Sequence, residues 1–226
     1  MPTRTWHNLA PERRQRVLQA AMAEFGRHGY SGGNLNAIAQ EAGVAKGSLF
    51  QYFENKFDLF AHTAEEVARR AQAHMAPWLG ELDPDQSFFE FFAIATEAWV
   101  RYWAEHPVER GVTVATNLEV DPAARTAVRE PIHRLYLAGL RPLLEQARAR
   151  GELYADADLD TLLTLLLVLL PHLAIAPFEP GLDPMLYSKN PRELRKAIRR
   201  LLAAIFAGFG PSLVASAATS TASQRT

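Results

Sequence analysis

Apolar residues recur every three or four positions along most of the chain, which is the period of an α-helix with one buried face. We find no segment in which apolar and polar residues alternate as they do in a half-buried strand. The pattern predicts helices over residues 11–28, 86–106, 108–118, 122–130 and 191–208, and a long helix that Pro131 starts or kinks and that reaches Arg150. The predicted fold class is therefore all-α.

Residues 38–52, IAQEAGVAKGSLFQY, place a small-residue turn between two short helical stretches. The side chains expected on the inside are Ile38, Ala39, Ala42, Leu49 and Phe53. Gly43 stands where the first stretch must end, and glycine takes the left-handed conformation that ends a helix without steric cost. A helix-turn-helix of this kind leaves one side of its second helix free to enter the major groove of DNA.

The remaining polar positions of this motif define a candidate DNA-binding surface. They are Asn34, Lys46, Gly47, Ser48, Gln51, Tyr52 and Lys56. Lysine binds phosphate with little sequence information, whereas glutamine or serine can contact base edges. Asn34 can also cap the first motif helix. Glycine inside a helix costs about 1 kcal/mol relative to alanine, so Gly47 indicates either close approach to a DNA backbone or tight helix packing.

This segment resembles the N-terminal DNA-binding domain of the tetracycline-repressor (TetR) family of bacterial transcriptional regulators. The resemblance runs from about Arg13 to Phe60 and rests on AAMAEFGRHGYSGGNLNAIAQEAGV, KGSLFQYF and Lys56. Ala45 and Phe50 depart from the family, which commonly has serine and tyrosine there. The resemblance implies a homodimeric, ligand-responsive regulator, with repression as the expected mode, that leaves a near-palindromic operator when a small effector binds.

Charge is divided unevenly along the chain. Residues 1–56 hold seven lysines and arginines and four acids, a net charge of +3, so the remainder carries −4 of the total −1. Positive charge beside the motif suits attraction to phosphate, and the acidic remainder would be repelled by it. We expect a DNA-binding domain with three helices over residues 1–56, a larger effector-binding and dimerisation domain over 57–212, and a disordered tail over 213–226.

The helix expected over residues 86–106 is unusually aromatic. Four of its aromatic residues share one face, at the place where family members keep an effector cavity, and ordinary core packing is the alternative for each of them. The candidate effector-binding residues are Phe88, Phe92, Trp99, Trp103, Asn117, His133 and Tyr136. The aromatic, leucine-rich interior favours an apolar effector, and the sequence identifies neither that effector nor the operator.

Residues 162–170, LLTLLLVLL, form a run of nine residues, against the roughly 20 that cross a bilayer, so we expect no membrane span. A helix that is apolar on all sides must be buried on all sides. The resemblance implies that this helix and the one over residues 191–208 form a four-helix homodimer interface. The sequence assigns no role to the proline-rich loop over residues 177–190.

Two alternatives are a helical-bundle enzyme with a carboxylate and histidine metal site, and a helical interaction protein that does not bind DNA. Glu130 and His133 have the Glu-x-x-His spacing of di-iron bundles, but such sites need two copies and the sequence has one. We predict no catalytic residue, metal or cofactor. The chain lacks cysteine, and its first residues lack the apolar core of a secretory signal, so we expect a cytoplasmic protein.

Overall fold

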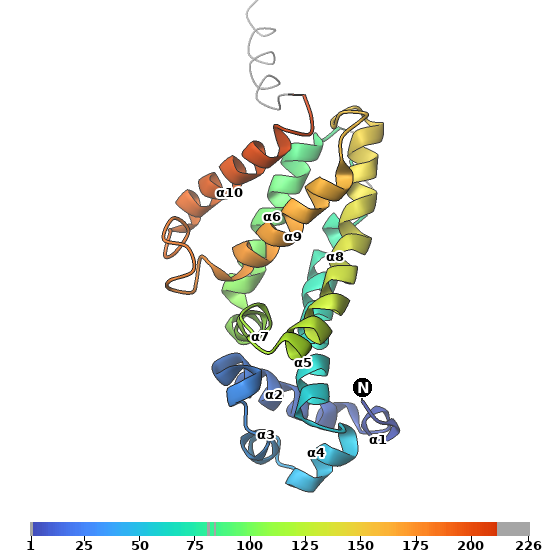
Figure 1. Ribbon diagram of the computed structural model, residues 1–226, viewed down its shortest axis with the longest axis vertical. Coiled ribbons are helices and arrows are strands. Elements are labelled where there is room, and N and C mark those ends of the chain that lie inside the picture. The colour runs from blue at the N-terminus through green and yellow to red at the C-terminus, as the bar shows by residue number, and fades with distance from the viewer. Residues whose placement is uncertain (1, 81, 84, 212–226) are drawn as a thin grey trace, which may run out of the picture. The chain divides into compact units, whose positions relative to one another are not determined.

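The computed structural model describes residues 2–80, 82–83 and 85–211, and within them every regular element is a helix, which confirms the predicted class. The elements, labelled in Figure 1, are α1 (Arg4–His7), α2 (Pro11–Gly32), α3 (Leu35–Glu41), α4 (Lys46–Tyr52), α5 (Lys56–Met75), the 3-10 turn η1 (Ala76–Trp78), α6 (Phe88–Glu105), α7 (Pro107–Asn117), α8 (Pro122–Ala149), α9 (Leu159–Ile175) and α10 (Pro191–Phe206). The tail predicted to be disordered, residues 213–226, lies outside the described residues.

The chain forms two compact units. The first comprises the residues through His74 together with Arg101–Leu135, and the second comprises Met75–Val100 and the described residues from Tyr136 onward. The helix-turn-helix, α5 and α7 belong to the first unit, α9 and α10 belong to the second, and α6 and α8 contribute to both. The boundary that we expect after residue 56, between the DNA-binding domain and the effector-binding and dimerisation domain, stays a prediction.

In the first unit, α2 and α7 cross with their backbones nearly in contact. A Cβ atom added at Gly111 of α7 would lie 3.0 Å from the carbonyl oxygen of Gly26 and 3.1 Å from its Cα. A side chain at either position would push the helices apart, because a core packed at native density has no room for another carbon. Beside the crossing, Phe25 meets Phe60 of α5 edge-on, with ring centroids 5.1 Å apart.

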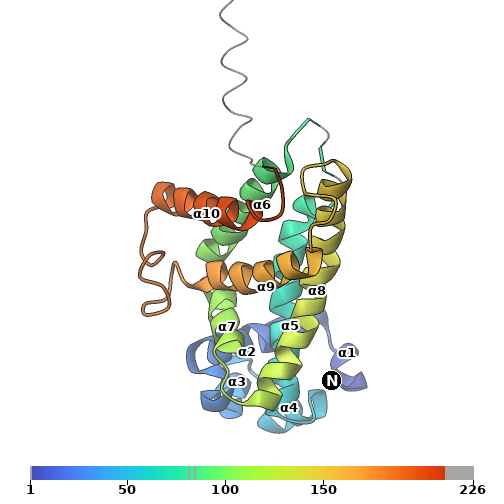
Figure 2. The same cartoon turned by 45° about the horizontal axis from the view of Figure 1, so that its top comes forward.

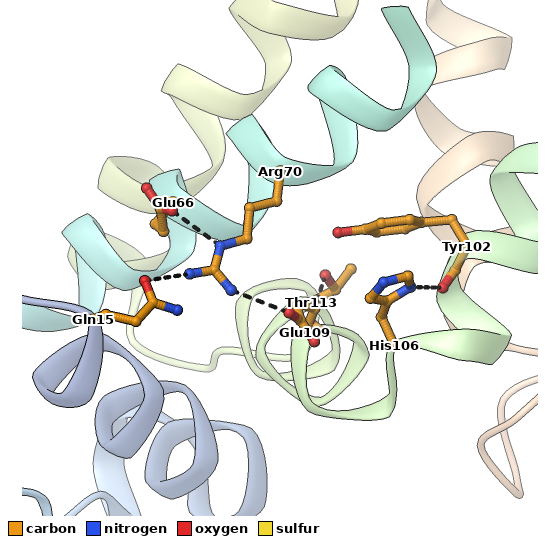
Figure 3. A network of polar contacts seen from close by, with 7 residues as sticks. All are labelled: Gln15, Glu66, Arg70, Tyr102, His106, Glu109 and Thr113. Carbon is orange, nitrogen blue, oxygen red and sulfur yellow. Dashed lines mark hydrogen bonds and ion pairs between the residues drawn. The ribbon is translucent and has the colours of Figure 1, made fainter. Parts of the chain in front are cut away.

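A polar network around Arg70 of α5 joins three helices of the first unit (Figure 3). Arg70 pairs with Glu66 on its own helix at 3.0 Å and with Glu109 of α7 at 3.3 Å. Its Nη2 atom also donates to Oε1 of Gln15 on α2, at 3.4 Å. Burial, with the charge of Glu109, raises the pKa of the neighbouring Tyr102 to about 12. The network fixes α2, which leads into the helix-turn-helix, against α5 and α7.

In the second unit, α9 and α10 both cross α6 (Figure 2). Phe206 of α10 meets Phe88 and Phe92 of α6 edge-on, with ring centroids 5.3 and 5.4 Å apart. The indole Nε1 of Trp99 on α6 donates to the carbonyl oxygen of Leu170 on α9, at 3.0 Å. Aromatic packing and this buried hydrogen bond hold the three helices together. In the described part of the chain, we find no helix with the length and apolar character that a membrane crossing requires.

One predicted helix boundary is wrong. We expected a short helix over residues 122–130, after which Pro131 would start or kink a long helix, but α8 is a single helix from Pro122 to Ala149, so Pro131 does not start one. Proline inside a helix costs about 3 kcal/mol, because it removes one hydrogen bond and crowds the preceding turn. Val128 and Leu140 are buried before and after it, and burial of this kind offsets the cost.

Candidate nucleic-acid interface

The helix-turn-helix has the local geometry that its sequence predicts. Oδ1 of Asn34 accepts a hydrogen bond from the backbone N–H of Asn36 at 2.8 Å, which is the expected cap of α3. Gly43 has φ 64°, so the left-handed residue that ends α3 is a glycine, as predicted. The N–H of Val44 then donates to the carbonyl of Ala39 at 2.9 Å and closes the turn. These contacts set where α4 begins.

One side of α4 is exposed and the other is buried. Leu49 is 2% exposed and faces the core, and Ser48 is half-buried. The exposed residues are Lys46, Gly47, Phe50 and Gln51. Positions i, i+1, i+4 and i+5 lie on one face of a helix, so these four residues form a continuous surface. We call this surface the outer face of α4.

Our prediction that Tyr52 lies on the outside of α4 is wrong. Tyr52 is 3% exposed, and its ring centroid lies 6.0 Å from that of Trp6. It follows Leu49 by three positions, so helical periodicity places both on the buried side. Phe50, for which we noted only the missing hydroxyl of tyrosine, is 48% exposed and lies on the outer face instead.

Gly47 makes no tight packing contact with the described part of the chain. A Cβ atom added there would meet no heavy atom within 4 Å. Tight helix packing, one of the two explanations that the sequence allows, is therefore excluded for the described residues. The other explanation, close approach of a second molecule to this surface, remains.

Lys56 is engaged inside the protein, unlike the exposed Lys46. Its Nζ atom donates to the carbonyl oxygens of Ser31 and Gly33, at 3.2 and 3.3 Å, and lies 4.8 Å from the ring centroid of Tyr30. The ammonium group thus ties the end of α2 to the start of α5. A phosphate contact by Lys56 stays a prediction, and Lys46 is the lysine of the outer face.

Sequence reasoning missed the N-terminal segment as part of this region. The backbone N–H of Thr3 donates to the carbonyl of Tyr52 at 2.9 Å, and its hydroxyl donates to the carbonyl of Gln51 at 2.6 Å. Trp6, in the same segment, is 2% exposed. A signal was present in the sequence, because threonine is a preferred N-cap residue and Thr3 stands at the start of α1.

The seven effector candidates divide between the two units. Those of the second unit are Phe88, Phe92, Trp99 and Tyr136, and those of the first are Trp103, Asn117 and His133. Phe88 and Phe92 are 1% and 3% exposed and pack on Phe206, so they fill the core of the second unit, as the alternative interpretation predicts. Contact of any of the seven with an effector stays a prediction.

Two of the three polar candidates, Asn117 and Tyr136, have partners within their own units. Nδ2 of Asn117 donates to the carbonyl of Thr113 at 2.9 Å. His133 is half-buried, and burial, followed by the positive charge of Arg129, lowers the pKa of its imidazole. The ring of Tyr136 meets that of Trp99 edge-on at 5.7 Å between centroids. In the described part of the chain, no cluster of three or more histidines and acids could hold a metal ion.

Comparison with known proteins finds a family model that matches the helix-turn-helix segment. Residues 17–63 match the family model described as bacterial regulatory proteins, tetR family. The HTH-type transcriptional repressor AcnR of Corynebacterium diphtheriae is 29% identical over 160 residues, which are 68% of this chain and 75% of that protein. The HTH-type transcriptional repressor NicS of Pseudomonas putida is 28% identical over 144 residues, 63% of this chain and 66% of that protein.

The fold has a solved counterpart in the fatty acid degradation regulator FadR from Bacillus halodurans. The two structures align with a TM-score of 0.68 over 86% of this chain and 96% of that one, at 21% sequence identity. The fold, the helix-turn-helix and these relatives define a DNA-binding transcriptional regulator and not an enzyme. The helix-turn-helix segment is similar to the TetR family model over residues 17–63, as the sequence motif indicates.

Proposed function

We propose that this regulator is a cytoplasmic, homodimeric repressor whose two α4 helices enter successive major grooves of a near-palindromic operator. The observation that carries the proposal is the outer face of α4, where Lys46, Gly47, Phe50 and Gln51 are exposed while Leu49 and Tyr52 anchor the helix from behind. Repression is the activity named for AcnR and NicS, and it comes to this chain as a proposal.

Each residue of the outer face has a chemical role in this proposal. Lys46 binds phosphate and contributes affinity for any DNA sequence. Gln51 hydrogen-bonds base edges, because its amide can donate to and accept from adenine in the major groove. Phe50 offers an apolar surface that suits the methyl group of thymine. Gly47 lets the sugar-phosphate backbone approach the helix without meeting a side chain.

Dimerisation is supported by an apolar surface on α9 that the described chain leaves uncovered. Val168 is 69% exposed and Leu165 is 39% exposed, whereas Leu162 and Leu166 of the same helix are fully buried. On α10, the exposed fraction of Leu201 is 36%. We propose that a second copy of α9 and α10 covers these side chains, which gives the leucine-rich helix burial on both sides.

We propose a small apolar effector for the second unit. The support is the aromatic character of α6, where Trp99 is 8% exposed and contacts the half-buried Tyr136. Binding would favour a conformer whose α4 helices no longer match half-sites about 34 to 36 Å apart, which releases DNA by population shift. Mass spectrometry of an organic extract of the purified protein tests the effector class, and co-purification of only polar molecules would count against an apolar one.

The proposed operator can be found without knowing any regulated gene. Purified protein is mixed with a pool of random duplexes, and the bound fraction is amplified and sequenced over several rounds. We expect an enriched motif that occurs twice in inverted orientation, with centres about one helical turn or a multiple of it apart, because a two-fold dimer presents two equivalent helices. Enrichment of a single asymmetric half-site, or of no motif, would contradict the proposal.

A further inference from the structure

The short N-terminal segment contacts the C-terminal end of α4. Two of its residues make the contacts, Thr3 through hydrogen bonds and Trp6 through its buried ring. We call these two residues the N-terminal anchor. Both precede Val17, the first residue matched by the family model, so the matched segment does not include them.

Thr3 satisfies backbone groups at the C-terminus of α4. The last carbonyls of a helix have no partner within that helix. Here Thr3 donates to two of them, with its hydroxyl at 2.6 Å from the carbonyl oxygen of Gln51 and its N–H at 2.9 Å from that of Tyr52. The same hydroxyl accepts from the N–H of Trp6 at 3.4 Å, which makes Thr3 the cap of α1 as well. One side chain therefore ends α4 and begins α1.

Trp6 covers the buried side of the same helix end. Its ring centroid lies 4.8 Å from that of Phe53, 6.0 Å from that of Tyr52 and 5.5 Å from the imidazole of His62 on α5. The tryptophan thus wedges the last residues of α4 against α5. Burying an indole of this size stabilises the contact by more than most side chains can, because aromatic groups bury the largest apolar areas.

The segment is itself attached to the rest of the first unit. Nη1 of Arg14 on α2 donates to the carbonyl of His7 at the end of α1, at 3.0 Å. Ala10 follows, and its carbonyl accepts from the N–H groups of Arg13 and Arg14 as α2 begins. The anchor can therefore hold α4 in a fixed orientation, because it is tied to α2 at its other end.

We propose that Thr3 and Trp6 are positioning residues that set the orientation of α4 and thereby the DNA-sequence preference of the regulator. A helix of seven residues is too short to be stable alone, so its position depends on tertiary contacts. Hydrogen bonds to base edges require close positioning, whereas a lysine can reach phosphate from several positions. This inference rests on the proposed function, in which α4 reads the operator.

The test compares binding to two DNA probes. The first is the duplex that the wild-type chain enriches from the random pool, and the second is a shuffled duplex of the same composition. We expect Thr3→Val, which replaces the hydroxyl with a methyl group and keeps the backbone N–H, to weaken binding to the enriched duplex about five- to tenfold and to the shuffled duplex by less than about twofold. Thr3→Ser keeps the hydroxyl and should bind both probes as the wild type does.

The tryptophan has a matched pair of variants. Trp6→Ala should lose preference for the enriched duplex at least as strongly as Thr3→Val, whereas Trp6→Phe keeps an aromatic ring and should restore most of it. Val112→Ala serves as the folding control, because this buried residue of α7 is not part of the anchor. It should lower the unfolding temperature without changing the ratio of the two affinities.

The outcomes separate the anchor from the proposed function. If Thr3→Val and Trp6→Ala both keep the wild-type preference for the enriched duplex, the positioning role of the anchor is wrong. It is also wrong if both variants bind the two duplexes equally more weakly, in proportion to the fall in their unfolding temperature. Gln51→Ala is measured alongside them. If Gln51→Ala loses the preference for the enriched duplex and the anchor variants keep it, the positioning role of the anchor is refuted and the proposed function stands. If Gln51→Ala keeps the wild-type preference, the proposal that α4 reads DNA is itself contradicted.

Discussion

Gly47 and Gly111 are both glycines inside helices, but their surroundings differ. Gly111 lies where α7 crosses α2, and a Cβ atom there would lie 3.0 Å from a backbone oxygen of Gly26. Gly47 has open space around its Cα and lies on the exposed outer face of α4. Packing among the described residues therefore requires glycine at the first position and not at the second.

Alanine at these two positions should have opposite effects on folding. Gly111→Ala forces the helices apart and should lower the free energy of unfolding by about 1 to 3 kcal/mol. Gly47→Ala should raise it by about 0.5 to 1 kcal/mol, because alanine loses less backbone entropy in a helix. Urea denaturation measures both. Gly47→Ala should nevertheless bind the enriched duplex at least about fivefold more weakly, and wild-type affinity in this variant would contradict the close approach of DNA.

The burial of a residue could be predicted from the sequence where it follows from local periodicity. It could not be predicted where the covering residue is distant in the sequence. Leu49 and Phe53 are 2% and 1% exposed, as their spacing predicts. For Tyr52 the spacing from Leu49 also indicates burial, but the residue that covers it, Trp6, lies in a different part of the sequence and was not foreseen. Lys56 was assigned to DNA alone because its carbonyl partners, Ser31 and Gly33, come together with it only in the folded chain.

At the scale of elements, the helices were predictable where capping or proline residues mark them. Oδ1 of Asn34 accepts the N–H of Asn36 at 2.8 Å at the start of α3, and Pro107 begins α7 one residue before the expected position. The continuity of α8 through Pro131 was not predictable, because it depends on burial that the rest of the fold supplies. For α9, the sequence indicates burial on all sides, and the described chain covers one side.

The exposed side of α9 leads to a prediction about assembly. Val168→Arg should convert the dimer to a monomer, as light scattering at micromolar concentration would show. Burying an unpaired charge in an apolar interface costs roughly several kcal/mol. The side chain is 69% exposed in the described chain, so the folded protomer should tolerate the change. Val108→Arg on α7, where the valine is 46% exposed, is the matched control and should remain dimeric. A dimeric Val168→Arg would contradict the proposed interface.

At the scale of the whole molecule, DNA contact and effector binding are assigned to different parts of the chain. Positive charge is concentrated through residue 56, and the remainder carries −4, so phosphate attraction favours contact through the motif. The sequence indicated the resemblance to the TetR family because several spacings of the motif agree at once, and it predicted the fold class from helical periodicity. It could not predict which aromatic residues line a cavity, because Phe88 and Phe92 have the same pattern whether they contact a ligand or, as observed, Phe206.

The central claim is that the outer face of α4 reads DNA, and the binding isotherm on the enriched and shuffled duplexes over a range of salt concentrations tests it most directly. Lys46→Ala should weaken binding to both duplexes alike and flatten the salt slope by about one unit, because one phosphate contact is lost. Gln51→Ala should leave the slope unchanged and reduce the preference for the enriched duplex by about 1 to 3 kcal/mol. If both variants keep the wild-type salt slope and the wild-type preference for the enriched duplex, the claim is contradicted.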